Sequence, residues 1–373
     1  MPVPAQRDLE ATRGILASWL ATKIAGASDI EVGPIGGPAS TGFSNETLIF
    51  DATWTADGAP HTESLVVRPE PVHHTVFMEQ DFESQYRVLT GLGEQTNVPV
   101  PPIKWYETDT SILGSRFFVM GKMDGRAPGD APPYTMSGWL LDESSPAQRR
   151  TLVGNGLAAM ASIHDVDWKG LGFDFLDKPQ YGATGFEQQL RYYEASYEWA
   201  AREQPAPPIA AAALDWVRAN APASDPEVGL CWGDARINNI LFGPDHDVVA
   251  VLDWEMVTLA DPMMDLGWWL FLDRHFHEGM PAPRMEGFPT REEMVAHYEK
   301  VRGVTARDLD FYEVFGGFRF AVIMMRIAHL LVEFELLPPD NDVATNNAVT
   351  RVLADMLGLE QPGPGLSNYA GAQ

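Results

Sequence analysis

The sequence changes character near Gly121, and this change constrains the fold more than any other feature. Before Gly121, short apolar runs alternate with turn signals such as Asp57-Gly58, a pair typical of hairpins. After Gly121, apolar residues recur mostly at helical spacing. Strand patterns followed by helix patterns predict an α+β chain. We therefore expect two lobes: a small β-rich N-lobe at 1–121 with a leading helix, and a larger, mainly helical C-lobe at 122–373.

The individual elements follow from the same patterns. Strands are predicted at 30–35, 46–54, 64–68, 103–107 and 116–120. Helices are predicted at 8–27, 77–92, 145–166, 185–203, 208–220, 264–272, 291–301, 308–336 and 345–357. A small β insertion is expected at 230–232, 240–242 and 248–253.

The composition is that of a globular protein, with 45% hydrophobic and 21% charged residues. Because no apolar run approaches about 18 residues and the N-terminus lacks an apolar core, we expect neither a membrane span nor a secretory signal. Cys231 is the single cysteine, so no intrachain disulfide can form, and a cytoplasmic location is favoured. The formal net charge of −26 predicts repulsion from nucleic acids and anionic membranes and attraction of a cationic small molecule.

An acid, an amide and a second acid lie close together in the β insertion. Asp234 is followed five residues later by Asn239, and Asp253 ends the next apolar strand. One carboxylate can orient and deprotonate an attacking hydroxyl, while an amide oxygen and a second carboxylate hold Mg²⁺ on nucleotide phosphates. Kinase-like catalytic loops show the same Asp-x-x-x-x-Asn spacing before a metal-binding Asp. In such a bilobal, protein-kinase-like chain the nucleotide would occupy the cleft between the lobes.

The loop at 36–45 is a candidate for phosphate binding, because glycine and small polar residues let backbone N–H groups approach phosphate oxygens. It nearly has P-loop spacing, but it lacks the P-loop lysine and no helix pattern follows. A strand–loop–strand flap over the phosphates fits better, and an ordinary Gly-rich hairpin remains the alternative. In the flap, Gly42, Phe43, Ser44 and Asn45 would contact the nucleotide.

Arg68 ends the third predicted strand, at the position where a kinase carries its phosphate-binding lysine. Its partner acid is expected on the following helix, where Glu79 and Glu83 are the candidates. We favour Glu83 over Gln85 because an ion pair requires a carboxylate. A surface role for both residues is the alternative.

Arg236 lies two residues after Asp234, so both side chains would point the same way on an extended loop. It could neutralise charge on the transferred phosphoryl group, or it could hold the loop by a salt bridge. Asp265 is expected to hydrogen-bond the loop that carries Asp234, and His164 is more typical of a satisfied interior histidine than of a catalyst.

Taken together, these motifs resemble the aminoglycoside phosphotransferase superfamily, also called the phosphotransferase enzyme family. The resemblance extends from about Ile35 to Leu272. Its most specific parts are Trp232-Gly233-Asp234-x-x-x-x-Asn239 and Leu252-Asp253-Trp254 followed by Asp261-Pro262-x-x-Asp265-Leu266. With Val66-Val67-Arg68-Pro69 on the third strand, the chain looks most like the branch related to kinase-like domains joined to acyl-CoA dehydrogenases.

This resemblance implies a protein-kinase-like fold and ATP- or GTP-dependent phosphorylation of a small-molecule hydroxyl. It implies that Asp234 is the catalytic base and that Asn239 and Asp253 hold Mg²⁺. It also implies that nucleotide hydrogen-bonds the linker near Met120 and Gly121.

Two departures from the resistance enzymes of this superfamily weaken the inference to an antibiotic acceptor: Trp232 stands where they have histidine, and Arg68 where they have lysine. The leading hypothesis is a Mg²⁺-dependent kinase for an aminoglycoside-like or other hydroxylated metabolite, with amines able to contact acids such as Asp273, Glu278 and Glu313. A kinase for a hydroxyacyl thioester and a pseudokinase that binds nucleotide without turnover are the alternatives.

Overall fold

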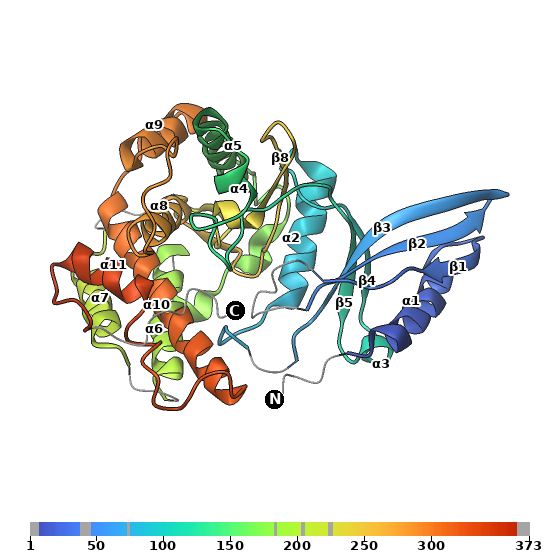
Figure 1. Cartoon of the computed structure of the whole chain (residues 1–373), viewed down its shortest axis with the longest axis horizontal. Helices are drawn as coiled ribbons and strands as arrows, with labels where there is room; N and C mark the ends of the chain where they lie inside the picture. Colours follow the sequence, from blue (N-terminus) through green and yellow to red (C-terminus); the bar gives the residue numbers. More distant parts are fainter. Residues whose placement is uncertain are drawn as a thin grey trace.

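The computed structural model describes residues 7–37, 46–72, 75–182, 185–202, 206–222 and 227–363. It has two lobes, a sheet-containing N-lobe and a mainly helical C-lobe, joined at the end of strand β5 (Figure 1). This arrangement confirms the predicted α+β, protein-kinase-like fold. The N-lobe elements are α1 Leu9–Lys23, β1 Ser28–Val32, β2 Leu48–Ala56, β3 Ala59–Pro69, α2 Phe82–Gln95, β4 Ile103–Glu107, α3 Thr110–Leu113 and β5 Phe117–Gly121.

The N-lobe sheet is antiparallel, with strand order β1-β2-β3-β5-β4. Its longest pairing is the β2–β3 hairpin, whose register runs from Leu48 opposite Val67 to Ala56 opposite Ala59. The turn is Asp57-Gly58, with φ of 51° and 75°. Two positive φ angles are those of a type I′ turn, which matches the twist of a hairpin.

Alternate residues of β5 face two different hydrophobic cores. Phe117 and Val119 belong to the N-lobe core, which also contains Trp19 of α1. Phe118 points to the opposite face, where it stacks on Phe82 of α2 at 5.2 Å and joins the large core that continues into the C-lobe. Since side chains alternate across a strand, the sheet lies between α1 and α2, and α2 connects it to the C-lobe (Figure 1).

Helices make up most of the C-lobe. They are α4 Trp139–Asp142, α5 Pro146–His164, α6 Gly185–Ala200, α7 Pro208–Ala219, α8 Met263–His277, α9 Arg291–Arg302, α10 Leu309–Glu333 and α11 Ala348–Leu357, with 3-10 turns η1 Phe173–Leu176 and η2 Pro179–Tyr181. Helix α10 is long and apolar enough to cross a membrane by length and composition, and 72% of its most apolar window is buried inside the protein. It packs against α6, α7, α8 and α11 as the central helix of the lobe.

Two short β ribbons frame the predicted catalytic loop. Strand β6 Gly229–Cys231 pairs with β9 Thr258–Ala260, and β7 Ile240–Phe242 pairs with β8 Val248–Val251. The 3-10 turn η3 Ile237–Asn239 lies between β6 and β7. The residues from Trp232 to Asp253 are therefore fixed at both ends by strand pairing.

The segment between β3 and α2 reaches across to the C-lobe. Glu79 in this segment contacts Lys178 at 3.4 Å and accepts a hydrogen bond from the Tyr181 hydroxyl. On α10, Arg326 donates to the backbone oxygen of Thr75 at 3.3 Å. These contacts join the two lobes on the side where α6 and α10 lie.

Candidate active site

Asp265, in the first turn of α8, fixes the start of the catalytic loop. One of its carboxylate oxygens accepts the backbone N–H of Trp232 at 2.6 Å, and the other accepts the backbone N–H of Gly233 at 3.0 Å. The Asp265 side chain is fully buried. Hydrogen bonds to an ionised carboxylate are stronger than those between neutral groups. The predicted contact between Asp265 and this loop is confirmed.

Gly233 allows the sharp turn that precedes Asp234. Its φ is +93°, and a Cβ atom at this position would lie 2.1 Å from the backbone oxygen of Met256. Both the conformation and the space therefore require glycine. The carbonyl oxygen of Gly233 accepts a hydrogen bond at 3.0 Å from Arg319, a fully buried residue of α10.

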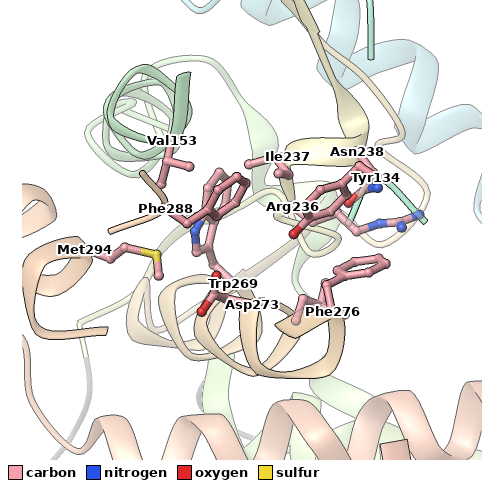
Figure 2. A pocket seen from close by; sticks show the side chains of 11 residues that line it. Tyr134, Val153, Arg236, Ile237, Asn238, Trp269, Asp273, Phe276, Phe288 and Met294 are labelled. Carbon is pink, nitrogen blue, oxygen red and sulfur yellow. The ribbon is translucent and has the colours of Figure 1, made fainter. Parts of the chain in front are cut away.

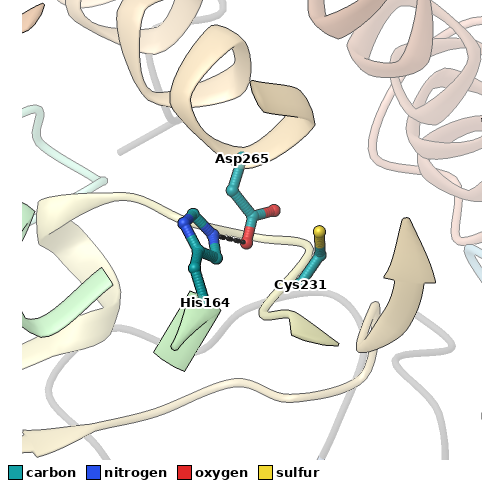
Figure 3. A group of neighbouring side chains, drawn as sticks. All are labelled: His164, Cys231 and Asp265. Carbon is teal, nitrogen blue, oxygen red and sulfur yellow. Dashed lines mark hydrogen bonds and ion pairs between the residues drawn. The ribbon is translucent and has the colours of Figure 1, made fainter. Parts of the chain in front are cut away.

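His164, Cys231 and Asp265 form a buried cluster behind the loop, with one potential ligand atom from each lying within 4.8 Å of the others (Figure 3). His164 contacts the Asp265 carboxylate at 3.1 Å through Nε2 and the Tyr298 hydroxyl at 2.7 Å through Nδ1. The Cys231 thiol faces the backbone oxygens of Ala260 and Asp261. Because each group already has hydrogen-bond partners, the cluster is a scaffold that holds Asp265, and His164 is the satisfied interior histidine predicted for it.

Three donors hold the Asp234 carboxylate. Its Oδ2 atom accepts hydrogen bonds from Asn239 Nδ2 at 2.7 Å and from Arg236 Nε at 3.0 Å. Its Oδ1 atom accepts one hydrogen bond from the described residues, that of the Trp268 indole N–H at 3.0 Å. A carboxylate oxygen has two acceptor positions, so Oδ2 is saturated and Oδ1 can accept one more hydrogen bond.

Arg236 links two acids from different parts of the chain. While Nε contacts Asp234, Nη1 contacts Asp130 Oδ1 at 2.7 Å. Burial opposes the charged guanidinium, but the carboxylates of Asp130, Asp234 and Asp253 outweigh it and raise the pKa of Arg236. Of the two roles open for Arg236, the structure shows the loop-holding salt bridge.

Asn239 and Asp253, the two predicted metal ligands, each have a side-chain oxygen that accepts no hydrogen bond from the described residues. Because the Asn239 amide nitrogen donates to Asp234, its amide oxygen is directed elsewhere and accepts no hydrogen bond from the described residues. Asp253 Oδ1 is buried and also lacks a hydrogen-bond partner in the described part of the chain. The backbone N–H of Leu252 donates to the Asn239 carbonyl at 2.8 Å, which joins the backbone just before Asp253 to that of Asn239. Two oxygens that accept no hydrogen bond from the described residues suit a hard cation such as Mg²⁺.

The environment of Asp253 disfavours an uncompensated negative charge. Burial raises the pKa of its carboxyl, and the nearby Asp234 carboxylate raises it further, while Arg68 opposes both. A divalent cation would favour the ionised form strongly. Asp253 also has a φ of 60°, a left-handed conformation that is uncommon for a residue other than glycine and clusters at functional sites.

Trp232 connects the loop of Asp234 to the backbone at Leu252 and Asp253. Its indole N–H is shared between the carbonyl oxygens of Leu252 at 2.8 Å and Asp253 at 3.2 Å. The side chain is fully buried. The residue that departs from the histidine of the resistance enzymes therefore fixes the backbone at Asp253.

Arg68 faces Asp253. Its Nη1 donates to Thr47 Oγ1 at 2.8 Å, and its Nη2 lies 3.8 Å from Asp253 Oδ1. The predicted ion pair between Arg68 and Glu83 is wrong, because the half-exposed Glu83 lies 3.8 Å from Arg116 instead. Glu79, the other candidate, contacts the C-lobe. Amphipathic spacing could not settle which polar side chains of α2 face inward, and Gln85 is one of those buried there.

The remaining predicted nucleotide contacts divide into two groups. Gly42, Phe43, Ser44 and Asn45 lie outside the described residues. Met120 and Gly121 end β5 at the junction of the lobes, where the backbone N–H of Gly121 donates to the Pro102 carbonyl at 2.9 Å. Their role in nucleotide binding stays a prediction.

The helix acids considered for amine binding are all paired with cationic side chains. Asp273 contacts Arg284 at 2.9 Å and His277 at 3.0 Å. Glu278 contacts Arg274 at 2.9 Å. Glu313 is buried and contacts Arg291 at 2.5 Å. Their charges are therefore largely neutralised within the protein.

A cavity of about 20 Å³ lies beside the side chain of Arg236, with Tyr134, Asp273 and Phe276 among its lining residues (Figure 2). This volume holds about one water molecule, so the cavity is too small for an acceptor. A wider groove of about 510 Å³ lies between the segments 135–149 and 281–286.

Three residues of the site carried no functional signal in the sequence. Trp268 follows Asp265 by three residues on one helix, which could have placed it near the loop. Asp130 comes from a turn-rich stretch more than a hundred residues away in the sequence. Arg319 belongs to an apolar helix, and nothing in the local pattern shows that it reaches Gly233.

Comparison with known proteins agrees with this geometry. The profile of the phosphotransferase enzyme family matches residues 39–304. The chain belongs to this family. It is therefore a phosphotransferase of the small-molecule kinase type.

Among its relatives is a probable acyl-CoA dehydrogenase, IBR3 of Arabidopsis thaliana, which is 28% identical over 303 residues. That match covers 76% of the phosphotransferase chain and 34% of the Arabidopsis protein, so the chain spans about a third of its relative's length.

Two solved structures illustrate the fold. A Ralstonia eutropha protein provisionally described as an aminoglycoside phosphotransferase is 26% identical, with a TM-score of 0.66 over 92% of this chain and 96% of that one. A thermostable mutant of aminoglycoside phosphotransferase APH(4)-Ia, solved with ADP and hygromycin B, has a TM-score of 0.54 over 96% of this chain and 99% of that one. At 14% identity the latter similarity concerns the fold alone.

Proposed function

We propose that this phosphotransferase moves the γ-phosphate of ATP, or of GTP, to a hydroxyl group of a small molecule in a Mg²⁺-dependent reaction. The observation that carries the proposal is the asymmetric environment of Asp234: Oδ2 accepts two hydrogen bonds, while Oδ1 accepts one from the described residues and keeps an acceptor position for a hydroxyl. A carboxylate held in this way can orient a hydroxyl and accept its proton.

The residues on the nucleotide side support the same reaction. Asn239 and Asp253 would hold Mg²⁺, which, when bound, offsets negative charge on the phosphates. Arg68 lies close enough to Asp253 to contact the same phosphates, and its guanidinium keeps a positive charge at this position. Complexes of the structural relative with ADP support the choice of a nucleotide as phosphoryl donor.

Asp234 would contribute to catalysis by orienting the acceptor hydroxyl as much as by accepting its proton. The Arg236 and Asn239 donors fix Oδ2, so the plane of the carboxylate is set before the acceptor arrives. Pre-organised geometry lowers the entropy cost of bringing the hydroxyl in line with the γ-phosphate. General acid–base help of this kind contributes about 10²–10⁴ in rate.

We propose that the acceptor lacks clustered positive charge. Asp273, Glu278 and Glu313 are neutralised by cationic partners, so they offer little to a polycation. Next to Asp234 lies Trp268, whose ring is within 5.6 Å of the Phe320 ring. Trp268 is buried, but Phe320 is partly exposed, and its apolar ring near the base favours an acceptor with an apolar portion.

A hydroxyacyl thioester is the second candidate acceptor. The similarity to a probable acyl-CoA dehydrogenase over 76% of this chain favours it. The match covers 34% of that protein, so the matched part is joined there to a longer stretch of other sequence. A hydroxyacyl chain also has the apolar portion that the aromatic surface would accommodate.

An ADP-release assay with Mg-ATP and a panel of acceptors tests the proposal. The panel contains aminoglycosides, neutral hydroxylated metabolites and hydroxyacyl thioesters. We expect acceptor-dependent ADP release with a neutral or acyl compound, and its loss in the Asp234→Asn variant. A pseudokinase would bind nucleotide yet release no ADP with any acceptor, and full activity of Asp234→Asn would exclude Asp234 as the base.

A further inference from the structure

Trp268 makes the only contact that the described residues offer to Asp234 Oδ1, the carboxylate oxygen left for the acceptor. Its side chain is buried, with 2% of its surface exposed, and it extends from the middle of α8. An indole N–H can donate but cannot accept. It therefore takes one acceptor position of Oδ1 and leaves the other to a hydroxyl.

The Trp268 ring is itself held by Arg319. The Arg319 guanidinium lies 4.7 Å from the Trp268 ring centroid and 5.0 Å from that of Tyr193, in the range of cation–π interactions. The same guanidinium donates to the carbonyl of Gly233, the residue before Asp234. One buried cation thus supports both the backbone that carries the base and the ring that contacts the base.

Arg319 has no carboxylate partner within the part of the chain that the structure describes, and its Nε and Nη1 atoms have no hydrogen-bond partner there. Isolated buried charge is costly, and apolar side chains often replace buried ions without loss of stability. The contacts that Arg319 does make are directed to Gly233 and Trp268. This pattern fits a role in the site better than a role in stability.

We propose that Trp268, supported by Arg319, is a positioning residue that orients the Asp234 carboxylate so that Oδ1 receives the acceptor hydroxyl. The predicted effect on catalysis rests on the proposed function, whereas the hydrogen bond between Trp268 and Asp234 is present whatever the function is. Substitution of Trp268 should lower the rate of transfer while leaving nucleotide affinity unchanged, since the nucleotide side of the site is built from Arg68, Asn239 and Asp253.

Trp268→Phe keeps a large aromatic ring and removes the N–H group. Trp269→Phe is the matched control, because Trp269 is the next residue of α8, is buried to 4% exposure, and makes no hydrogen bond with the described residues. We expect kcat to fall about 10- to 100-fold in Trp268→Phe, as for loss of a group that orients a catalytic one. The Kd for Mg-ATP should change less than about twofold. Trp269→Phe should keep kcat within about threefold of wild type.

Indole ¹⁵N–¹H correlation spectra test the hydrogen bond without any acceptor. The Trp268→Phe spectrum identifies the resonance of this indole by its absence. Asp234→Asn removes the negative charge from the group that accepts the bond, so it should displace the Trp268 resonance more than the Trp269 resonance. The charged groups near this contact are Asp130, Arg236, Asp253, Arg68 and Arg319, and all remain unchanged in the comparison.

These two measurements separate the possible failures. A Trp268 resonance that does not respond to Asp234→Asn would overturn the proposal whatever the enzyme's activity. Equal losses of kcat in Trp268→Phe and Trp269→Phe would reduce Trp268 to a packing residue. If wild type transfers phosphate to no hydroxyl acceptor, the proposed function fails, while the displaced resonance would still support Trp268 as the residue that orients Asp234.

Discussion

Replacement of Trp232 by phenylalanine should lower two quantities that can be measured separately: the free energy of unfolding and the affinity for Mg²⁺. The change removes the N–H that is shared between the carbonyls of Leu252 and Asp253. Leaving these buried acceptors short of a donor costs about 1–3 kcal/mol. The smaller ring leaves a gap in a fully buried site, which adds about 1–2 kcal/mol. The free energy of unfolding should therefore fall by about 2–5 kcal/mol, or roughly 3–6 °C in melting temperature for a chain of 373 residues.

The same change should weaken Mg²⁺ binding, because the lost bond fixes the backbone of a metal ligand. Groups that orient ligands contribute about 10- to 100-fold to metal affinity. We expect the Mg²⁺ concentration for half-maximal activity to rise by this factor in Trp232→Phe, measured by titration at saturating ATP. Trp254→Phe is the control, since Trp254 is buried and donates to the carbonyl of Val251 rather than to that of Asp253. Equal Mg²⁺ shifts in the two variants would refute the reasoning.

Three further variants test other parts of the site. Arg68→Ala should weaken Mg-ATP binding about 10- to 100-fold, the cost of losing a charged hydrogen bond. Arg68→Lys should lose less affinity, with both Kd values measured by calorimetry. An unchanged Kd in Arg68→Ala would show that Arg68 is not part of the nucleotide site. Burial, assisted by Arg236, lowers the pKa of His275 to about 3. Below pH 6.5 this histidine therefore binds a proton in the unfolded chain but stays neutral in the folded protein, and stability is lost as pH falls. Between pH 7.5 and 5.5, urea unfolding should therefore show wild type losing about 1.4 kcal/mol more than His275→Phe, and equal losses would contradict a neutral buried His275. Gly233→Ala should abolish transfer because its Cβ meets the Met256 carbonyl, whereas Gly303→Ala, where φ is also positive at +73° but the space is open, should only reduce the melting temperature. An active Gly233→Ala enzyme would show that the turn tolerates a side chain.

The sequence was sufficient for the order and type of most elements because their patterns are local. The helix predicted at 291–301 is Arg291–Arg302, and the strand predicted at 103–107 is Ile103–Glu107. Element ends were less accurate where polar residues flank the pattern: the helix predicted from 77 begins at Phe82, after its capping residue Asp81. The short β9 strand was missed because its three residues lack a period of their own.

The acids of the site could be found because their spacing along one ribbon is fixed by chemistry. The partners that orient them could not, because these come from distant segments. Asp130 and Trp268 meet Asp234 only through tertiary packing. The choice of Glu83 failed for a related reason: charge identified a possible partner for Arg68, but the direction of the side chain depends on how α2 packs on the sheet.

The most direct test of the account is ³¹P NMR of a reaction with Mg-ATP and an active acceptor. Wild type should produce ADP and a new phosphomonoester resonance in equal amounts. Asp234→Asn should bind Mg-ATP with similar affinity and produce the phosphomonoester at least about a hundredfold more slowly. Formation of the phosphomonoester at the wild-type rate by Asp234→Asn would contradict the central claim that this carboxylate receives the acceptor hydroxyl.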